Sequence, residues 1–261
     1  MSIRHCFKYD KIIIDGINLN IQKSKVTFII GANGSGKSTL ANIISGLLYP
    51  VSGKLSIDDI TINKKTDNKL IRNKVGIVFQ NPSNQIIFSK VYDDIKFTLE
   101  NMKVEKTLIP EIIKDSLKKV NMENFMNTNP YELSGGEQQR IAIASQLSLN
   151  PDYLIFDEAT SMIDINGKQA IYKLINSLKK KMGIIFITNN MDELIYADEI
   201  VIIDNHKTYK YEINDILNDN TILTKHNLQI PFIFKLATTL KINNIDDLNE
   251  KSILERIKKN G

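Results

Sequence analysis

The chain has 261 residues, of which 42% are hydrophobic and 25% are charged, so it can form a sizeable core and is not disordered. Its 34 basic residues against 30 acidic ones leave a net charge of +4, too small to indicate nucleic-acid binding. A single cysteine, Cys6, excludes an internal disulfide framework. No apolar run approaches the roughly 20 residues of a membrane-spanning helix, and the N-terminus lacks the apolar core of a signal peptide. We therefore expect a cytosolic protein that reaches any membrane through a partner.

Short apolar strands alternate with helical patterns along most of the chain. This alternation predicts an α/β core with a parallel sheet. The helix expected between the strands Tyr153–Phe156 and Ile184–Ile187 carries its apolar residues on one face, as a crossover helix does. The expected elements are strands at Val26–Ile30, Val75–Phe79, Tyr153–Phe156, Ile184–Ile187 and Ile200–Ile203, and helices at Lys37–Leu48 and Asn166–Lys181.

Two regions interrupt the alternation. Residues 1–25 and 53–62 contain short apolar runs that predict an antiparallel β flank. Residues 81–150 contain helical patterns and no convincing strand, so we expect a helical insertion in the α/β core. Its expected helices include Val91–Met102 and Ile109–Val120.

The last part of the chain is helical again. We expect helices at Phe232–Lys241, which follows Pro231, and at Asp246–Lys258. The predicted organisation is an α/β domain over residues 1–211 and a C-terminal helical appendage over residues 212–261.

A glycine-rich turn lies between the first core strand and the first helix. Residues Gly31–Ser38 fit the phosphate-loop pattern G-x-x-x-x-G-K-[ST]. Glycines let backbone N–H groups point at phosphates, and the start of the following helix adds a favourable dipole. Lys37 would reach the β- and γ-phosphates, and the Ser38 hydroxyl would bind Mg²⁺. The alternative is a glycine-rich turn that only caps a helix.

Two carboxylates, Asp157 and Glu158, follow the expected strand Tyr153–Phe156 directly. One carboxylate at such a position can hold Mg²⁺, and the next can polarise an attacking water. The alternative is a buried strand that simply ends in acidic residues, which is common.

A third motif opens a helix with two consecutive glycines, Gly135 and Gly136. Ser134 and Glu137 are spaced as a capping box, which is the simpler interpretation of the segment. Two glycines are nevertheless costly at a helix start unless a ligand must approach the backbone. Their exposed N–H groups would form a second anion site, without a lysine.

These three motifs, in this order, resemble those of the ATP-binding-cassette (ABC) ATPases. Over residues 3–211, the resemblance implies a P-loop NTPase fold in which Leu133–Glu137 is the signature motif. In this family the signature of one subunit caps the ATP held by another, so Ser134, Gly135, Gly136 and Glu137 would face the partner's ATP. The ATP-binding residues that it implies are Tyr9, Gly31, Ala32, Asn33, Gly34, Ser35, Gly36, Lys37, Ser38 and Thr39.

The resemblance also implies individual roles. Tyr9 would stack on adenine, Gln80 would be the Q-loop glutamine, and Asp164 would end the D-loop. Glu158 would act on the attacking water. The implied Mg²⁺ ligands are Ser38, Gln80 and Asp157.

One position departs from the family pattern. Where these ATPases have the switch histidine, which contacts the γ-phosphate, this chain has Asn189. Asparagine can donate a hydrogen bond through its amide, but it cannot carry a proton or a positive charge. Either this substitution weakens the chain's own ATP site or it is tolerated with little effect.

A narrower resemblance is to the ATPase subunits of energy-coupling-factor (ECF) transporters, which power uptake of vitamins and metal ions such as cobalt. Segments Val78–Gln85, Val91–Phe97 and Asp157–Asp164 carry it, with the tail from Leu228 onward. Asn81-Pro82 resembles the first of the two ATPases that pair in such transporters. For Gln85 and Phe88, ordinary surface and packing roles remain the alternative.

The resemblance implies an ATP-hydrolysing importer subunit at the cytoplasmic face of the cell membrane. Its expected partners are a second ABC ATPase, identical or related, an integral-membrane component and a substrate-binding membrane subunit, with no nucleic acid. The tail is expected to be a dimer contact. The alternatives are an ATPase for export or lipid transport, or a soluble ABC protein acting on ribosomes or DNA.

Overall fold

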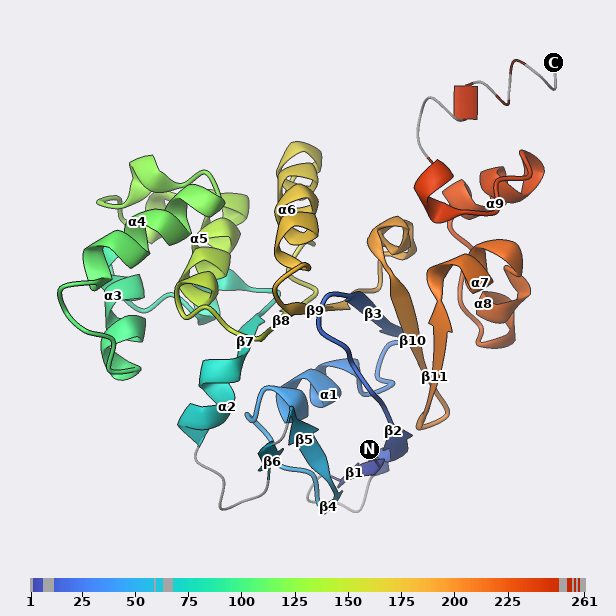
Figure 1. The fold of residues 1–261 in the computed structure, drawn as a ribbon, viewed down its shortest axis with the longest axis horizontal. Coiled ribbons are helices and arrows are strands. Elements are labelled where there is room, and N and C mark those ends of the chain that lie inside the picture. Colours follow the sequence, from blue (N-terminus) through green and yellow to red (C-terminus); the bar gives the residue numbers. More distant parts are fainter. Residues whose placement is uncertain are drawn as a thin grey trace.

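The computed structural model describes residues 2–6, 12–58, 60–62, 68–248, 253, 254, 256 and 258. At its centre lies a six-stranded sheet with the strand order β11-β10-β3-β9-β8-β7 (Figure 1). The five strands predicted from apolar runs all lie in this sheet and run parallel to one another. The strands are β3 (Val26–Gly31), β7 (Val75–Val78), β8 (Tyr153–Asp157), β9 (Gly183–Ile187), β10 (Glu199–Asp204) and β11 (Lys207–Glu212).

The edge strand β11 is absent from the sequence-based prediction. It pairs antiparallel with β10 along its whole length. Most of its side chains are exposed, so its sequence lacks the apolar run by which the buried strands are recognised. An edge strand with charged side chains also resists pairing with other chains.

The sheet is covered on both faces, which explains the continuous apolar runs. Successive side chains of a strand point to opposite faces, so Ile29 and Phe28 belong to different hydrophobic clusters. On one face, helix α1 (Lys37–Ile44) and the β flank pack against the isoleucines of the strands. On the other face, Phe186 stacks between Phe28 and Phe156, with ring centroids 5.0 and 4.5 Å apart. Helices α5 (Gly135–Ser148) and α6 (Ile165–Leu178) cover these rings.

Helix α1 ends four residues earlier than the predicted Leu48. The last helical residue is Ile44, and Ser45 is the C-cap. Gly46 then adopts a left-handed φ of 73°, which prevents the helix from continuing. A Cβ atom on Gly46 would lie 2.8 Å from Ile71 Cδ1, so the turn also needs the missing side chain. The N–H groups of Leu47 and Leu48 turn back to the Asn42 carbonyl. The apolar Leu47-Leu48 pair therefore follows the helix and is not part of it.

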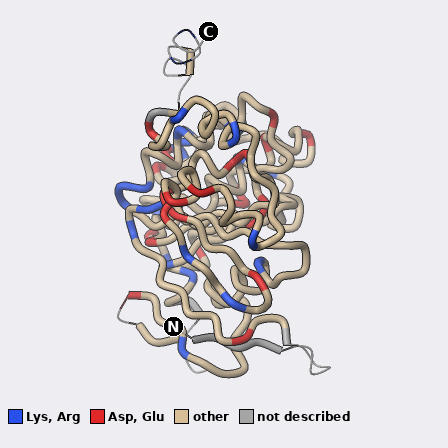
Figure 2. The backbone as a smooth tube through the Cα atoms, turned by 90° about the vertical axis from the view of Figure 1, so that its right-hand side faces the viewer, with Lys and Arg blue, Asp and Glu red and all other residues tan. Residues whose placement is uncertain are grey.

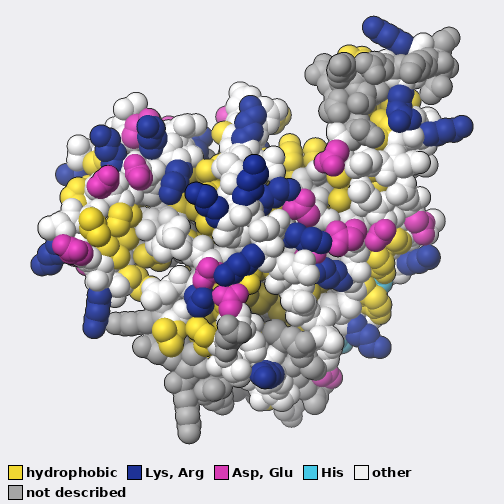
Figure 3. Space-filling model, viewed as in Figure 1, with side chains coloured by type: hydrophobic (Ala, Val, Ile, Leu, Met, Phe, Trp, Pro, Cys, Tyr) yellow, Lys and Arg dark blue, Asp and Glu magenta, His cyan; other side chains and the backbone are white. Residues whose placement is uncertain are grey.

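The predicted helical insertion is confirmed between β7 and β8. Short helix α2 (Asn68–Lys74) leads into β7, and the insertion contains α3 (Val91–Asn101), α4 (Ile109–Lys119) and α5. The insertion forms an arm at the left of the molecule (Figure 1). Hydrophobic side chains gather on the surface of this arm over α3 (Figure 3), where Ile87 and Phe97 are exposed.

The predicted antiparallel flank is also confirmed. It consists of the three-stranded sheet β2-β1-β4 and the hairpin β5-β6, both antiparallel. The strands are β1 (Ser2–Cys6), β2 (Ile12–Asn18), β4 (Ser52–Gly53), β5 (Leu55–Ile57) and β6 (Ile60–Ile62).

The C-terminal segment forms helices α7 (Ile213–Asn218), α8 (Thr221–Lys225) and α9 (Phe232–Thr239). The predicted helix after Pro231 is thus confirmed, two residues shorter at its end. Of the predicted Asp246–Lys258 helix, residues 249–252, 255 and 257 lie outside the described part of the chain. Seen from the β11 side, basic and acidic residues are interspersed along the backbone rather than segregated (Figure 2). Within the described residues, no helix combines the length and apolarity needed to cross a bilayer.

Candidate functional site

The carboxyl ends of three neighbouring strands bring the predicted site residues together. Gly31 ends β3, Asp157 ends β8, and Asn189 follows the end of β9. Ligands of parallel α/β sheets bind at this edge, beyond the carboxyl ends of the strands. Residues far apart in sequence thereby share one side of the sheet.

The phosphate loop depends on glycine at Gly34 and Gly36. Their φ angles are 79° and 99°, in the left-handed region that side-chain-bearing residues rarely adopt. A Cβ atom on Gly36 would lie 2.9 Å from Ile14 Cγ1, so β2 packs directly against the backbone of the loop. A glycine-rich turn that only caps a helix would not need this close approach.

Most polar groups of the phosphate loop are available to bind a ligand. The Ser35 N–H donates to the Ala32 carbonyl at 3.1 Å, but no other backbone N–H from Asn33 to Thr39 has a hydrogen-bond partner among the described residues. The Ser35 hydroxyl is buried, and it too has no partner in the described chain. Unpaired donors at a helix start form an anion site. This arrangement fits the phosphates of a nucleotide.

Lys37 lies over this loop with its side chain buried. Its ammonium group donates to the Gly31 carbonyl at 2.8 Å and to the Ala32 carbonyl at 3.0 Å. Burial lowers the pKa of Lys37, while the carboxylates of Glu158 and Asp157 raise it. The charge is thus held by carbonyl oxygens at the point where phosphate would enter.

Ser38 and Asp157 meet across the gap between α1 and β8. The Ser38 hydroxyl donates to Asp157 Oδ1 at 3.1 Å. Burial raises the pKa of Asp157, and the Ser38 hydrogen bond opposes that rise. No lysine, arginine or histidine of the described chain forms an ion pair with Asp157.

This oxygen pair fits a magnesium ion brought by a nucleotide. Mg²⁺ takes oxygen ligands and is usually held by one or two protein oxygens together with substrate phosphates. The described residues contain no cluster of three or more histidine, cysteine or acidic side chains that could hold a metal alone. A cation here would therefore depend on phosphate oxygens.

Glu158 and Asn189 face each other at the same edge. Glu158 has a left-handed φ of 51°, and its N–H donates to the Ile187 carbonyl at 2.8 Å. The Asn189 amide donates to Glu158 Oε1. Asn189, which replaces the family's switch histidine, is thus in direct contact with the carboxylate expected to act on water.

The remaining predicted site residues make fewer contacts with one another. Gln80 follows β7 and is exposed, and Thr39 lies half-buried in α1. Asp164 caps α6 by accepting from the Gly167 N–H at 2.7 Å. Tyr9 lies outside the described residues.

The predicted capping box at Ser134 is confirmed. Ser134 N–H donates to Glu137 Oε2 at 2.9 Å, and the Ser134 side chain accepts from the Glu137 N–H. Cβ atoms on Gly135 and Gly136 would meet only ordinary contacts, 3.9 and 3.7 Å away. In a helix interior, glycine is less stabilising than alanine by about 1 kcal/mol. Since a Cβ atom would fit at both positions, nothing in the described chain favours glycine here. Among the described residues, no hydrogen bond or ion pair joins residues 134–137 to residues 31–39.

The sequence-based prediction does not include Glu193 among the site residues. Its buried carboxylate accepts hydrogen bonds from Thr160 and Thr188, next to the Glu158 and Asn189 segments. The only signal in the sequence is an acidic residue four positions after Asn189. Such a spacing does not distinguish a buried carboxylate from an exposed one.

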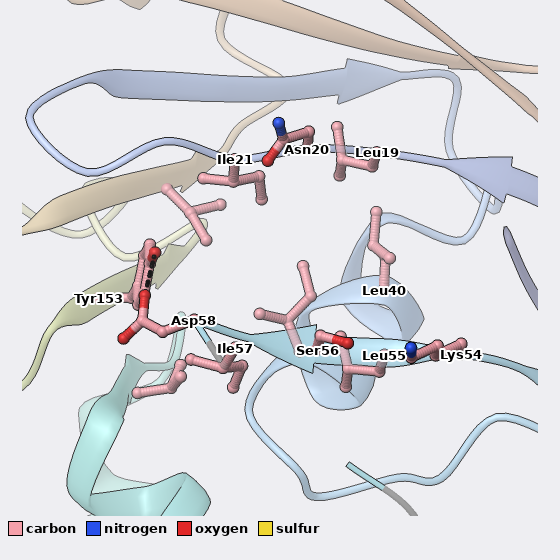
Figure 4. Close-up of a pocket in the computed structure, with 13 residues that line it drawn as sticks. Leu19, Asn20, Ile21, Leu40, Lys54, Leu55, Ser56, Ile57, Asp58 and Tyr153 are labelled. Atoms are coloured by element: carbon pink, nitrogen blue, oxygen red, sulfur yellow. Dashed lines mark hydrogen bonds between the residues drawn. The ribbon is translucent and has the colours of Figure 1, made fainter. Parts of the chain in front are cut away.

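A cavity of about 620 Å³ lies away from this edge, between the β flank and α1. Figure 4 shows apolar side chains in its walls, including Leu19, Leu40 and Leu55, and the hydrogen bond from Tyr153 to Asp58 among the lining residues. None of residues 31–39 lines it. The cavity is therefore separate from the phosphate loop.

The family model of the ABC transporters matches residues 14–161 of this chain. The chain belongs to this family. It is 41% identical over 259 residues to the energy-coupling factor transporter ATP-binding protein EcfA1 of Mesomycoplasma hyopneumoniae, covering 97% of this chain and 94% of that relative. It is 43% identical over 248 residues to the EcfA1 protein of Mycoplasmopsis pulmonis, covering 94% of this chain and 92% of that relative. The chain is therefore an ABC ATPase of the energy-coupling factor type.

Solved structures agree on the fold. CbiO1 of Clostridium perfringens, part of an ABC transporter complex, superposes with a TM-score of 0.77 at 31% identity, covering 91% of this chain and 96% of that one. A dimeric bacterial ABC transporter cassette gives a TM-score of 0.74 at 27% identity, covering 81% and 97%. The predicted α/β P-loop NTPase fold is confirmed.

The buried Asp157 leads to a stability prediction for the ABC ATPase. Because burial raises the Asp157 pKa above its unfolded value, the ionised group destabilises the folded state at neutral pH. Asp157→Asn should raise the melting temperature of the nucleotide-free protein, on the order of 2 °C. The gain should shrink in acid, where the carboxyl group is protonated in both states. Differential scanning fluorimetry across pH measures both effects.

Asp152→Asn is the matched control. Hydrogen bonds from Lys23 and Lys74 lower the Asp152 pKa, so this substitution should lower the melting temperature at neutral pH. A loss of stability in Asp157→Asn as large as in the control would contradict the prediction.

Proposed function

We propose that this ABC ATPase binds Mg²⁺ and ATP at the sheet edge described above and energises uptake of a vitamin or metal ion by an ECF-type transporter. One observation carries the proposal. The N–H groups around Lys37, which have no partner among the described residues, adjoin the Ser38–Asp157 oxygen pair and the Glu158 carboxylate at one edge of the sheet. Phosphate binding, metal binding and activation of water thereby share one site.

The chain's own residues would act in sequence. Lys37 would exchange its carbonyl contacts for the β- and γ-phosphates, with the loop N–H groups binding the remaining phosphate oxygens. Ser38, Asp157 and Gln80 would hold Mg²⁺, which supplies charge compensation for those phosphates. Glu158 would orient the attacking water and accept its proton at a carboxylate oxygen.

Asn189 would donate its amide hydrogen to the γ-phosphate. In the structure that amide donates to Glu158 Oε1. Since an amide cannot carry positive charge, it would stabilise the developing charge less than a protonated histidine would. We expect hydrolysis at this chain's own site to be slow compared with a site that has the histidine.

A second copy or a related ATPase would complete the site. Within the described part of the chain, nothing requires glycine at Gly135 and Gly136, and so we infer that they admit the phosphates bound to the partner subunit. Helix α9, whose Phe232 is 74% exposed, would provide a further contact between the two ATPases. The dimeric bacterial cassette is consistent with this pairing.

The arm would dock an integral-membrane component. A groove of about 260 Å³ lies between α3, β7 with the segment that follows it, the end of α5 and the turn after α1, and exposed Ile87 and Phe97 border it. Gln85 joins the groove to β7, because it accepts from the Phe79 N–H and donates to the Ile77 carbonyl. We infer that a cytoplasmic helix of the membrane component occupies this groove. The ATPase would then lie at the cytoplasmic face of the membrane, together with a substrate-binding membrane subunit.

The phosphate loop and Glu158 can be tested separately. In the assembled transporter, Lys37→Ala should lower ATP hydrolysis by at least 10²-fold, on the order expected for losing a charge contact to the transferred phosphoryl group. Glu158→Gln should retain ATP binding and lose hydrolysis. Lys114→Ala on the exposed face of α4 is the control and should change neither. Hydrolysis at the wild-type rate in Lys37→Ala would disprove the assignment of this site.

The docking groove can be tested by cross-linking. After Cys6 is replaced, single cysteines at exposed Ser83 or Ser89 should cross-link to an integral-membrane chain in intact cells. A cysteine at Ser177, near the end of α6, is the control and should not. If the Ser83 and Ser89 variants give no membrane-protein product, or no more than Ser177→Cys gives, another surface docks the membrane component.

A further inference from the structure

Glu193 is a buried carboxylate that takes no part in the proposed chemistry. It is only 4% exposed. Its Oε1 accepts from the Thr160 hydroxyl at 2.9 Å and from the Lys168 ammonium at 3.2 Å, and its Oε2 accepts from the Thr188 hydroxyl at 2.8 Å. One carboxylate oxygen therefore binds the segment after β8 and the start of α6, and the other binds the segment after β9.

The two threonines flank the residues expected to act on water and phosphate. Thr188 directly precedes Asn189, and its hydroxyl also accepts from the Asn190 N–H at 3.0 Å. Thr160 lies two residues after Glu158. A single buried carboxylate thus binds one threonine side chain on each side of the Glu158–Asn189 hydrogen bond.

The same carboxylate binds residues on both sides of the D-loop, residues 161–164. Within this loop, the N–H groups of Ser161 and Ile163 donate to the carbonyls of Glu158 and Thr160. Lys168 lies in the first turns of α6, immediately after the loop. The Ile163 backbone in turn lies against Gly136, where an added Cβ would be 3.7 Å from Ile163 Cα. The loop that Glu193 holds at Thr160 and Lys168 therefore lies beside the start of α5.

Burial makes these contacts interdependent. A carboxylate removed from water is stable only while hydrogen-bond donors satisfy its oxygens. Movement of either threonine would leave a buried negative charge poorly satisfied. Burial and the nearby Glu193 charge raise the pKa of the Tyr172 hydroxyl, which lies beside this carboxylate.

We propose that Glu193 is a positioning residue for ATP hydrolysis, which holds the Asn189 amide and the Glu158 carboxylate in register through Thr188 and Thr160. The inference rests on the roles proposed above for Glu158 and Asn189. Glu193 itself touches neither water nor phosphate in this account. Its loss should therefore slow the hydrolysis step without weakening ATP binding.

Glu199 provides a matched control. It is fully buried, it accepts from the Thr27 hydroxyl at 2.6 Å, and it pairs with Lys210 at 2.8 Å. It begins β10, however, at the opposite end of the sheet from the phosphate loop. A purely structural carboxylate should behave like Glu199.

The experiment measures single-turnover hydrolysis and ATP affinity in the assembled transporter. If the companion ATPase is a different chain, it carries a disabled phosphate loop so that only this chain's site reacts. Glu193→Gln should lower the hydrolysis rate constant on the order of tenfold, with the ATP Kd within about twofold of wild type. Glu199→Gln should lower the melting temperature and leave the rate constant unchanged.

A double-mutant cycle with Asn189→Ala separates positioning from general destabilisation. If Glu193 acts through Asn189, the effect of Glu193→Gln should fall below about twofold once the Asn189 amide is gone. An undiminished effect in that background, or an unchanged rate constant in Glu193→Gln itself, would overturn the proposal. Should Glu193→Gln fail to assemble, Thr188→Val removes one donor only, and the same two criteria apply to it.

Glu158→Gln distinguishes failure of this inference from failure of the proposed function. If Glu158→Gln hydrolyses ATP at the wild-type rate, the assignment of the water-activating residue is wrong and the inference falls with it. If Glu158→Gln is inactive while Glu193→Gln matches the wild type, only the positioning role is wrong.

Discussion

The backbone N–H groups of the phosphate loop impose the main constraint on this structure. From Asn33 to Thr39, all except Ser35 lack a partner among the described residues. Such groups are tolerated only where water or an anion can reach them. The strands therefore have to deliver the loop to an open edge of the sheet, and the packing of β2 and β10 keeps it there. A Cβ atom on Gly31 would lie 2.5 Å from the Ile203 carbonyl, so β10 fixes the loop as closely as β2 does.

Burial disfavours the charged forms of two side chains at this edge. Burial lowers the pKa of Lys37 and raises that of Asp157, so both charged forms are less stable here than in water. Lys37 compensates by binding loop carbonyls, and Asp157 by accepting from Ser38. Phosphates and a divalent cation would compensate both groups more completely. Binding energy and folding energy are therefore linked at the same side chains.

Much of the fold and of the site could be predicted from the sequence, because the deciding features are local. Buried strands such as Ile184–Ile187 are continuous apolar runs, and Gly31–Ser38 has a spacing that few other structures require. The end of α1 was mispredicted, since Leu47 and Leu48 continue the apolar pattern while Gly46 ends the helix. Strand β11 has no apolar run because it lies at an edge. Glu193 could not be predicted, because its burial depends on Thr160 and Thr188 meeting across two loops.

The central claim is that the ATP bound at Lys37 of one ATPase is completed by Ser134–Gly136 of another. A structure of the assembled transporter with ATP and Mg²⁺, carrying Glu158→Gln to prevent hydrolysis, tests it most directly. We expect γ-phosphate oxygens in contact with Lys37 of one chain and with the N–H groups of Gly135 and Gly136 of the other. An ATP molecule contacted by one chain alone, with Ser134–Gly136 of the other chain facing solvent, would contradict it.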